Sequence, residues 1–187
     1  RKEKVKIEAQ RRRQVAQKSG DFEGNTTSQL VQAGAVVDIA MTEAATKFVT
    51  PRAFRSLTER EPYVDMWNSY GEFGEAHVEL ARHADLMLIA PATASTMARL
   101  AHGLADNFVS LTALATEAPL LLAPAMDSQM WAHGATQFNR ALLEERGAQF
   151  IGPAEGRLAS GRTGTGRLVE PREIVAEVRA RLGRERL

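Results

Sequence analysis

The chain has 187 residues, 44% of them hydrophobic and 25% charged, which suits one domain with a substantial core and is too short for two ordinary domains. It contains no cysteine, which excludes disulfides, thiolate metal sites and a cysteine nucleophile. No apolar run is long enough to span a membrane, and residues 1–18 lack the apolar stretch of a secretory signal, so we expect a cytoplasmic protein.

The charge is unevenly distributed. Residues 1–18 carry eight Lys or Arg against two Glu, whereas the remainder has 16 Lys or Arg against 21 Asp or Glu. A basic arm can contact nucleic acid, but no aromatic residues alternate with the basic ones here, so we expect a solvated segment and no nucleic-acid partner. We therefore divide the chain into an atypical basic segment, residues 1–24, and one domain, residues 25–187.

Short apolar runs alternate with helix-like segments along the domain. A helix is predicted to end at Gly34. Strands are predicted at residues 35–41, 85–90, 119–123 and 149–151, and helices at residues 42–47, 93–104, 135–146 and 172–182. The Gly- and Arg-rich residues 155–167 look too irregular for a strand or a helix. This order predicts an α/β fold with a parallel sheet covered by helices on both faces, and ligands bind beyond the carboxyl ends of such strands.

Five segments near those ends, or near the sheet, carry polar residues that could take part in binding or catalysis. They are MTEAATKFVTP at residues 41–51, EAHVEL at 75–80, PATAST at 91–96, PAMDSQMW at 124–131 and GRLASGRTGTGR at 156–167. Each also has an ordinary structural interpretation. The first, third and fourth can be capped helices, the histidine can be structural or solvated, and the last can be a flexible loop.

Together, in this order and spacing, the segments resemble the FMN-dependent cysteine decarboxylases, a flavoprotein family that includes phosphopantothenoylcysteine decarboxylase and peptidyl-cysteine decarboxylases. The resemblance runs from about Ser28 to the C-terminus. It implies a Rossmann-like three-layer flavoprotein fold, bound FMN, and assembly as trimers or as a dodecamer of trimers. The last residues resemble the linker to a ligase domain in bifunctional relatives, so this chain would be one half of a longer protein.

The resemblance also implies roles for individual residues. His77 takes the position of the family's base, and histidine titrates near neutrality as a base needs to. The implied catalytic residues are His77, Asp127 and Ser160. The implied cofactor-binding residues are Thr42, Phe48, Pro91, Ala92, Thr93, Ala94, Ser95, Thr96 and Ala125. The implied substrate-binding residues are Asp127, Met130, Arg157, Ala159, Arg162 and Arg167.

Three of these positions depart from the family pattern. Ser95 and Asp127 stand where the family has Asn, and Ser160 stands where phosphopantothenoylcysteine decarboxylases have the Cys that donates a proton. An ionised Asp127 only accepts hydrogen bonds and would repel the substrate carboxylate, unless it keeps its proton because two close carboxylates raise one pKa. A serine hydroxyl is a much weaker acid than a thiol.

The family's first strand and its phosphate-binding Gly-Ser-Ile-Ala turn are not recognisable in residues 1–24. Residues 24–28 (GNTTS) precede a predicted helix and offer hydroxyls and N–H groups as a weak substitute. The leading hypothesis is FMN-dependent decarboxylation of 4′-phosphopantothenoylcysteine to 4′-phosphopantetheine in coenzyme A biosynthesis. The alternatives are oxidative decarboxylation of another cysteine-containing substrate to an enethiol, and a non-catalytic partner or regulatory subunit.

Overall fold

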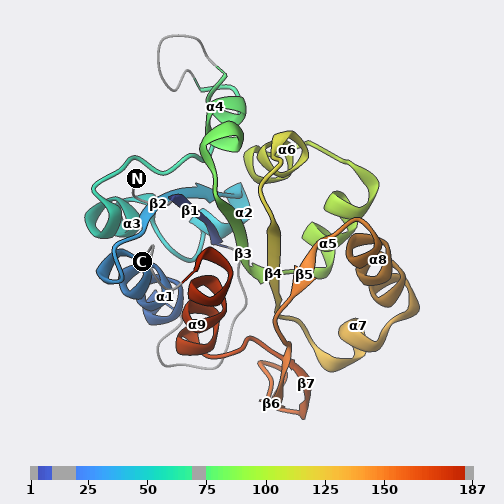
Figure 1. Cartoon of the computed structure of the whole chain (residues 1–187). Helices are drawn as coiled ribbons and strands as arrows, with labels where there is room; N and C mark the ends of the chain where they lie inside the picture. The colour runs from blue at the N-terminus through green and yellow to red at the C-terminus, as the bar shows by residue number, and fades with distance from the viewer. Residues whose placement is uncertain (1–3, 10–19, 69–74, 184–187) are drawn as a thin grey trace.

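Five parallel strands form the central sheet of the protein, in the order β2-β1-β3-β4-β5 (Figure 1). The computed structural model describes residues 4–9, 20–68 and 75–183. The strands are β1 (Lys4–Ala9), β2 (Val36–Met41), β3 (Leu86–Ala92), β4 (Leu120–Pro124) and β5 (Gln149–Phe150). β1 pairs with β2 on one side and with β3 on the other, so both of the longest strands flank it.

The middle strands are apolar on both faces because helices cover both sides of the sheet. Every residue of β3 is buried. Its Leu86, Leu88 and Ala90 belong to one apolar cluster, and the alternate residues Met87 and Ile89 belong to another. This alternation follows from the two-residue period of a strand. The sheet therefore separates two hydrophobic cores, as the sequence predicts for a three-layer fold.

Layers of helices cover the two cores. The first layer consists of α1 (Gly20–Gln32), α3 (Pro51–Thr58) and α9 (Pro171–Leu182), which contribute Leu30, Phe54 and Ile174. The second layer consists of α4 (Ala76–His83), α5 (Ala94–His102), α6 (Phe108–Ala115) and α8 (Gly134–Glu145). None of the helices in the described ranges is long and apolar enough to cross a membrane.

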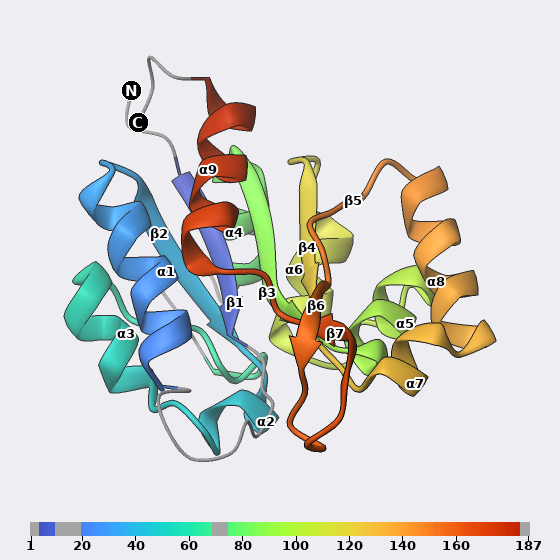
Figure 2. The same cartoon turned by 90° about the horizontal axis from the view of Figure 1, so that it is seen from below.

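The remaining elements gather at the carboxyl edge of the sheet. These are the short helices α2 (Glu43–Thr46) and α7 (Ser128–Ala132) and an antiparallel hairpin of β6 (Ala154–Arg157) and β7 (Thr163–Arg167). Seen from below, α2, α7 and the hairpin lie on the same side of the strands (Figure 2). This is the edge at which the sequence predicts a ligand.

Two expectations from the sequence are wrong. Residues 155–167 do not form an irregular loop, because β6 and β7 pair in register from Ala154–Arg167 to Arg157–Thr163. The first strand is also present: residues 4–9 (KVKIEA) supply β1 in the middle of the sheet. Charged residues alternate with apolar ones in this segment, so it lacks the continuous apolar run that is typical of a buried parallel strand.

The predicted capping turn at residues 24–28 is likewise not a turn. These residues lie inside α1, which begins at Gly20 and ends at Gln32. The expected phosphate-binding turn would follow β1, and residues 10–19 lie outside the described part of the chain. The other predicted strands and helices are confirmed within one or two residues at each end.

Candidate active site

Three strands of the sheet, β2, β3 and β4, end in the same way, with a side chain that caps the following helix. Thr42 follows β2 and caps α2, accepting a hydrogen bond from the Ala45 N–H at 3.2 Å. Thr93 follows β3 and caps α5, and Asp127 follows β4 and caps α7. A cap side chain replaces an acceptor that the first turn of a helix lacks. The carboxyl edge is therefore lined with ordered helix starts.

The turn between β3 and α5 is built from small, buried residues. Pro91 and Ala92 end the strand and are buried rather than exposed at its mouth. The Thr93 hydroxyl accepts from the Thr96 N–H at 3.2 Å and lies 3.3 Å from the Thr96 hydroxyl. Thr96 itself is buried. This arrangement fixes the backbone at the start of α5.

The geometry of this turn suits a flat polar ligand such as a flavin. Helix geometry leaves the N–H groups of Ala94 and Ser95, the first two helical residues, without an acceptor inside the helix. Ala92 and Ala94 present no more than a methyl group beside them. Small side chains allow a ligand to approach backbone donors closely, so the predicted cofactor segment 91–96 has the chemistry that its role requires.

Ser95 is already engaged by an arginine from the next turn of the helix. The Arg99 guanidinium donates to the Ser95 hydroxyl and also donates to Asp106 at 2.8 Å. The Arg99 hydrogen bond is the main cause of a pKa for the Asp106 carboxyl below its ordinary value of 3.8. The serine that replaces the expected Asn thus belongs to a hydrogen-bonded network with Arg99 and Asp106, to which the Asn107 side chain also donates at 3.1 Å.

The turn after β4 connects the sheet to the hairpin. The Ala125 N–H donates to the Ala92 carbonyl at 3.1 Å, which ties the ends of β4 and β3 together. The next N–H, that of Met126, donates to the Gly166 carbonyl of β7 at 2.9 Å. Through these two bonds the hairpin is held against the same edge as the β3–α5 turn.

Asp127 and Ser160 lie in direct contact across this junction. Asp127 Oδ1 accepts from the Gln129 N–H at 3.0 Å, and Asp127 Oδ2 accepts from the Ser160 hydroxyl at 2.7 Å. The two residues are 33 positions apart in the sequence. The structure thereby joins two of the three predicted catalytic residues, and both are the ones that depart from the family pattern.

The predicted substrate-binding residues of the hairpin differ in their exposure and in their partners. Arg157 and Arg162 are exposed on β6 and on the turn, and Ala159 is half-buried beside Ser160. Arg167 instead forms an ion pair with Glu170 at 2.6 Å. Met130 is 41% exposed. Of the three arginines, Arg157 and Arg162 are thus the ones exposed beside the Ser160 turn.

His77 and Phe48 come from other elements, His77 from α4 and Phe48 from the segment after α2. His77 is the second residue of α4 and is half-buried, and the structure gives its side chain no hydrogen bond to any described residue. A helix that leads into a parallel strand runs antiparallel to it, so the start of α4 points toward the carboxyl edge. Phe48 follows α2 and is 43% exposed, which is unusual for a large apolar side chain and leaves its ring accessible.

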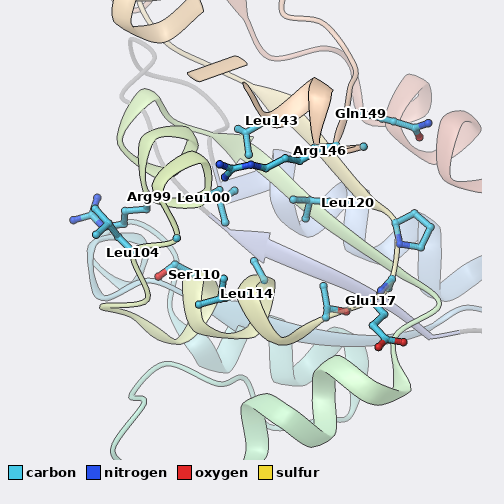
Figure 3. A pocket seen from close by; sticks show the side chains of 17 residues that line it. Arg99, Leu100, Leu104, Ser110, Leu114, Glu117, Leu120, Leu143, Arg146 and Gln149 are labelled. Carbon is cyan, nitrogen blue, oxygen red and sulfur yellow. Dashed lines mark hydrogen bonds between the residues drawn. The ribbon is translucent and has the colours of Figure 1, made fainter. Parts of the chain in front are cut away.

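A pocket of about 520 Å³ lies elsewhere, among α5, α6 and α8 (Figure 3). Its lining includes Pro119 and Leu120 at the start of β4 and Gln149 at the start of β5, so it opens at the amino ends of these strands. None of the predicted site residues lines it. The Arg146 side chain lies within the pocket and donates to the Ala101 carbonyl at 2.6 Å. The pocket is therefore separate from the candidate active site.

The fold and the capped strand ends define an α/β protein with its ligand site at the carboxyl edge of a parallel sheet. Residues 24–183 match the family model described as Flavoprotein, and the chain therefore belongs to that family. This confirms the resemblance found in the sequence.

Individual relatives agree with that assignment. The chain is 45% identical over 149 residues to the Coenzyme A biosynthesis bifunctional protein CoaBC of Bacillus subtilis, a match that covers 80% of this chain and 37% of the relative. It is 30% identical to a PPC decarboxylase variant complexed with pantothenoylaminoethenethiol, with a TM-score of 0.80 over 96% of this chain and 98% of that one. The FMN-dependent cysteine decarboxylase SpaF gives a TM-score of 0.75 at 27% identity, over 97% of each chain. The chain spans well under half the length of the curated CoaBC relatives.

Proposed function

We propose that this chain is the decarboxylase part of a coenzyme A biosynthesis protein and converts 4′-phosphopantothenoylcysteine to 4′-phosphopantetheine with FMN as cofactor. The observation that carries the proposal is the likeness to the PPC decarboxylase complex, which extends over 96% of this chain. The likeness to the CoaBC proteins, which covers 80% of the chain in the first of them, supports the same pathway.

The carboxyl edge of the sheet offers the groups that would hold FMN. The small residues Ala92 and Ala94 and the free first-turn N–H groups of α5 fit the flavin ring and its side chain. Thr42 follows β2 directly, Phe48 follows α2, and Ala125 follows the end of β4. When bound, FMN would supply the redox chemistry, as acceptor of a hydride from the carbon that carries sulfur and as its donor in the final reduction.

The protein's own residues would manage the protons and the carboxylate. His77 takes up a proton during oxidation of the cysteine side chain to a thioaldehyde, which withdraws electrons from the bond to the carboxylate. Asp127 lies on the carboxylate side of the site. Arg157 and Arg162 are positioned to bind the substrate phosphate, since guanidinium groups form strong paired hydrogen bonds with phosphate. Met130 and Ala159 would contact the apolar part of the substrate.

A second function is favoured by one specific feature, the serine at position 160. The PPC decarboxylase variant in the comparison has a Cys replaced by Ser and is complexed with an enethiol. If Ser160 stands at the position of that family Cys and donates no proton, the reaction would stop at oxidative decarboxylation and release an enethiol. The mass of the product separates the two functions, because the reduced thiol is heavier by two hydrogens.

The assembly proposed from the resemblance is a cytoplasmic homotrimer or a dodecamer of trimers, with a ligase half fused after α9. The bifunctional relatives support the fusion, because this chain matches about 37% of the Bacillus subtilis protein. Light scattering on the purified chain, and on any longer natural form of it, would determine the oligomer size.

The first experiment is a visible absorption spectrum of the purified protein, followed by release and identification of the chromophore. Bound FMN together with CO₂ release from 4′-phosphopantothenoylcysteine is the expected result. The His77→Asn variant should keep FMN but lose CO₂ release by about a hundredfold or more, as is typical when a general base is removed. A protein that does not take up added FMN would contradict both enzyme functions and favour the non-catalytic partner subunit.

A further inference from the structure

The contact between Asp127 and Ser160 joins a potential proton source to a hydroxyl. Asp127 Oδ1 is occupied by the Gln129 N–H, so Oδ2 is the oxygen that faces Ser160, at 2.7 Å from its hydroxyl. Oxygen atoms at this separation form a good hydrogen bond along which a proton can move. Asp127 is half-buried and Ser160 is exposed at the tip of the hairpin. The pair therefore faces the open side of the candidate active site.

The position of Ser160 is fixed by the backbone of the hairpin. At its base, Gly166 accepts from the Met126 N–H, and a Cβ on Gly166 would lie 2.2 Å from the Met126 carbonyl oxygen. Gly164 lies against Ser128 less tightly, and an added Cβ there would be 3.0 Å from the serine Cβ. At Gly166 only glycine permits the approach, so the hairpin docks directly on the start of α7.

The tip of the hairpin is ordered in its own right. The Leu158 N–H donates to the Arg162 carbonyl at 2.7 Å, and the Gly161 N–H donates back to the Leu158 carbonyl at 2.9 Å. The Leu158 side chain is buried. Ser160 thus lies in a closed turn, and its contact with Asp127 follows from the backbone path rather than from a mobile side chain.

We propose that Asp127 and Ser160 form a proton relay that completes the reduction of the enethiol. This inference rests on the proposed function. In the last step the carbon–carbon double bond of the enethiol receives a hydride at one carbon and a proton at the other. Ser160 gives its hydroxyl proton to the carbon while the protonated Asp127 carboxyl passes its own proton to the serine oxygen, so no free alkoxide forms. In the structure the hydrogen bond runs from the Ser160 hydroxyl to Asp127 Oδ2, and it reverses direction when Asp127 carries the proton.

The electrons and protons of this scheme balance. The hydride removed in the oxidation step returns in the reduction, so no external oxidant or reductant is needed. Decarboxylation as a whole consumes one proton from solvent, and in this scheme it is the proton that reloads Asp127 after each turnover. While substrate is bound, a proton shared between Asp127 and the substrate carboxylate removes their mutual repulsion. Departure of CO₂ leaves that proton on Asp127.

The relay accounts for both altered positions together. A serine alone is too weak an acid to replace a thiol, and an aspartate alone would repel a substrate carboxylate. When the two are in contact, the Asp127 carboxyl is the acid, and the Ser160 hydroxyl carries its proton to the substrate carbon. A simple latch that closes the hairpin is the competing role, and it requires only an acceptor at position 127.

The Asp127→Asn variant separates these two roles because an amide oxygen still accepts from Ser160 but carries no acidic proton. The measurement is the amount of reduced thiol formed per CO₂ released, from product masses after a single turnover of the FMN-loaded protein. We expect this ratio to fall about a hundredfold in Asp127→Asn and equally in Ser160→Ala. The double variant should be no worse than either single one, since the residues act as one unit.

A second measurement tests the proton transfer itself. In D₂O the formation of reduced thiol should slow several-fold in the unaltered protein, and this isotope effect should disappear for the residual reduction in Ser160→Ala. Thermal unfolding of each variant confirms that the hairpin is still folded. A normal thiol ratio in Asp127→Asn would leave the latch as the role of the pair and overturn the relay.

The outcomes distinguish the relay from the function on which it rests. If the unaltered protein releases no CO₂, the proposed decarboxylation is wrong. If it releases CO₂ but yields only enethiol, decarboxylation stands and the relay is overturned.

Discussion

Thr93 and Asp127 occupy equivalent places after the adjacent strands β3 and β4, yet their side chains have different hydrogen-bond partners. Each caps the helix that follows its strand. The Thr93 hydroxyl makes its contacts within its own turn, to the backbone and side chain of Thr96. Asp127 uses one oxygen for its cap and the other for Ser160, 33 residues away.

The difference shows how one local structure supports two kinds of site. At the β3–α5 turn the backbone N–H groups are available to a ligand, and the side chains mainly hold that backbone in place. At the β4–α7 turn the Asp127 side chain itself is the group that we propose to face the substrate, and the hairpin supplies its partner, Ser160. Substitutions at the first turn should therefore affect cofactor affinity, and substitutions at the second should affect the docking of the hairpin and the product.

The largest effect is expected where the hairpin meets α7. In Gly166→Ala the new methyl group would lie 2.2 Å from the Met126 carbonyl oxygen. The clashing atom belongs to the backbone, which can move aside only at a cost in energy. We therefore expect the free energy of unfolding to fall by about 1–3 kcal/mol, as for other overpacked sites. Denaturant unfolding measures this loss. Faster hydrogen exchange at the Met126 amide would show that its bond to Gly166 has broken.

Gly134→Ala is the matched control for that substitution. A Cβ at Gly134 has no neighbour within 4 Å, and the residue lies in the first turn of α8. Its stability should stay the same or rise slightly, because alanine is the better helix former. Equal stability of the two alanine variants would show that the hairpin is not docked through Gly166.

A smaller loss is expected at the cap of α5. Thr93→Val keeps the shape of the side chain but removes the oxygen that accepts from the Thr96 N–H. Loss of a helix cap typically costs about 1 kcal/mol, and this chain should then melt about 2–4 °C lower. FMN affinity should fall as well, because the cap fixes the first turn of α5, where we propose that the flavin binds.

Thr50→Val provides the comparison. Thr50 precedes α3 with an extended backbone like that of Thr93, but its hydroxyl makes no capping hydrogen bond. Valine at position 50 should therefore leave both the melting temperature and the FMN affinity nearly unchanged. A similar drop in both variants would assign the effect to the loss of a polar residue rather than to the cap.

The sequence predicts most of the fold because the buried strands are locally unambiguous. Residues 35–41, 85–90 and 119–123 are mainly apolar runs, with Asp38 and Asp85 as the exceptions, and they become β2, β3 and β4. β1 was missed because charged residues alternate with apolar ones, so its place in the sheet depends on pairing with Val36–Met41 and not on its own composition. The glycines of β7 were interpreted as irregular, whereas they are required by close packing on Met126 and Ser128.

The candidate site was predicted as a set of residues but not as an arrangement. Local motifs identified Asp127 and Ser160 separately, and nothing within either segment indicates that they touch across 33 positions. The Arg99 network is a different case. Ser95 and Arg99 are four residues apart on a predicted helix, a spacing that places side chains together, so this contact was open to prediction. The His77 position relative to the other site residues stays a prediction.

The next prediction tests the backbone donors of the β3–α5 turn without disturbing the helix. Ala94→Pro removes the N–H of the first helical residue, where proline is well tolerated, and Thr93 already has the extended backbone that must precede a proline. FMN affinity should fall about five- to tenfold, the value of one neutral hydrogen bond. Titration of the apoprotein by flavin fluorescence measures it. Ala94→Val adds similar bulk but keeps the N–H, so equal affinities in the two variants would argue against a backbone contact.

The smallest effect concerns Asp106, the acidic end of the Ser95 network. Its hydrogen bond to Arg99 lowers the pKa of the Asp106 carboxyl below the ordinary 3.8. A pKa that is lower in the folded state stabilises the fold above the unfolded value, and this contribution disappears as the pH falls from about 4 through the lowered folded pKa. The stability difference between the unaltered protein and Asp106→Asn should therefore shrink in that acidic range.

An NMR titration of the Asp106 carboxyl tests the cause directly. Its midpoint should lie below 3.8 and should move back up in Arg99→Met, which removes the guanidinium but keeps an unbranched side chain. A midpoint that does not move would mean that Arg99 is not what holds the carboxyl ionised, and the Ser95 contact would then have no anchored arginine behind it.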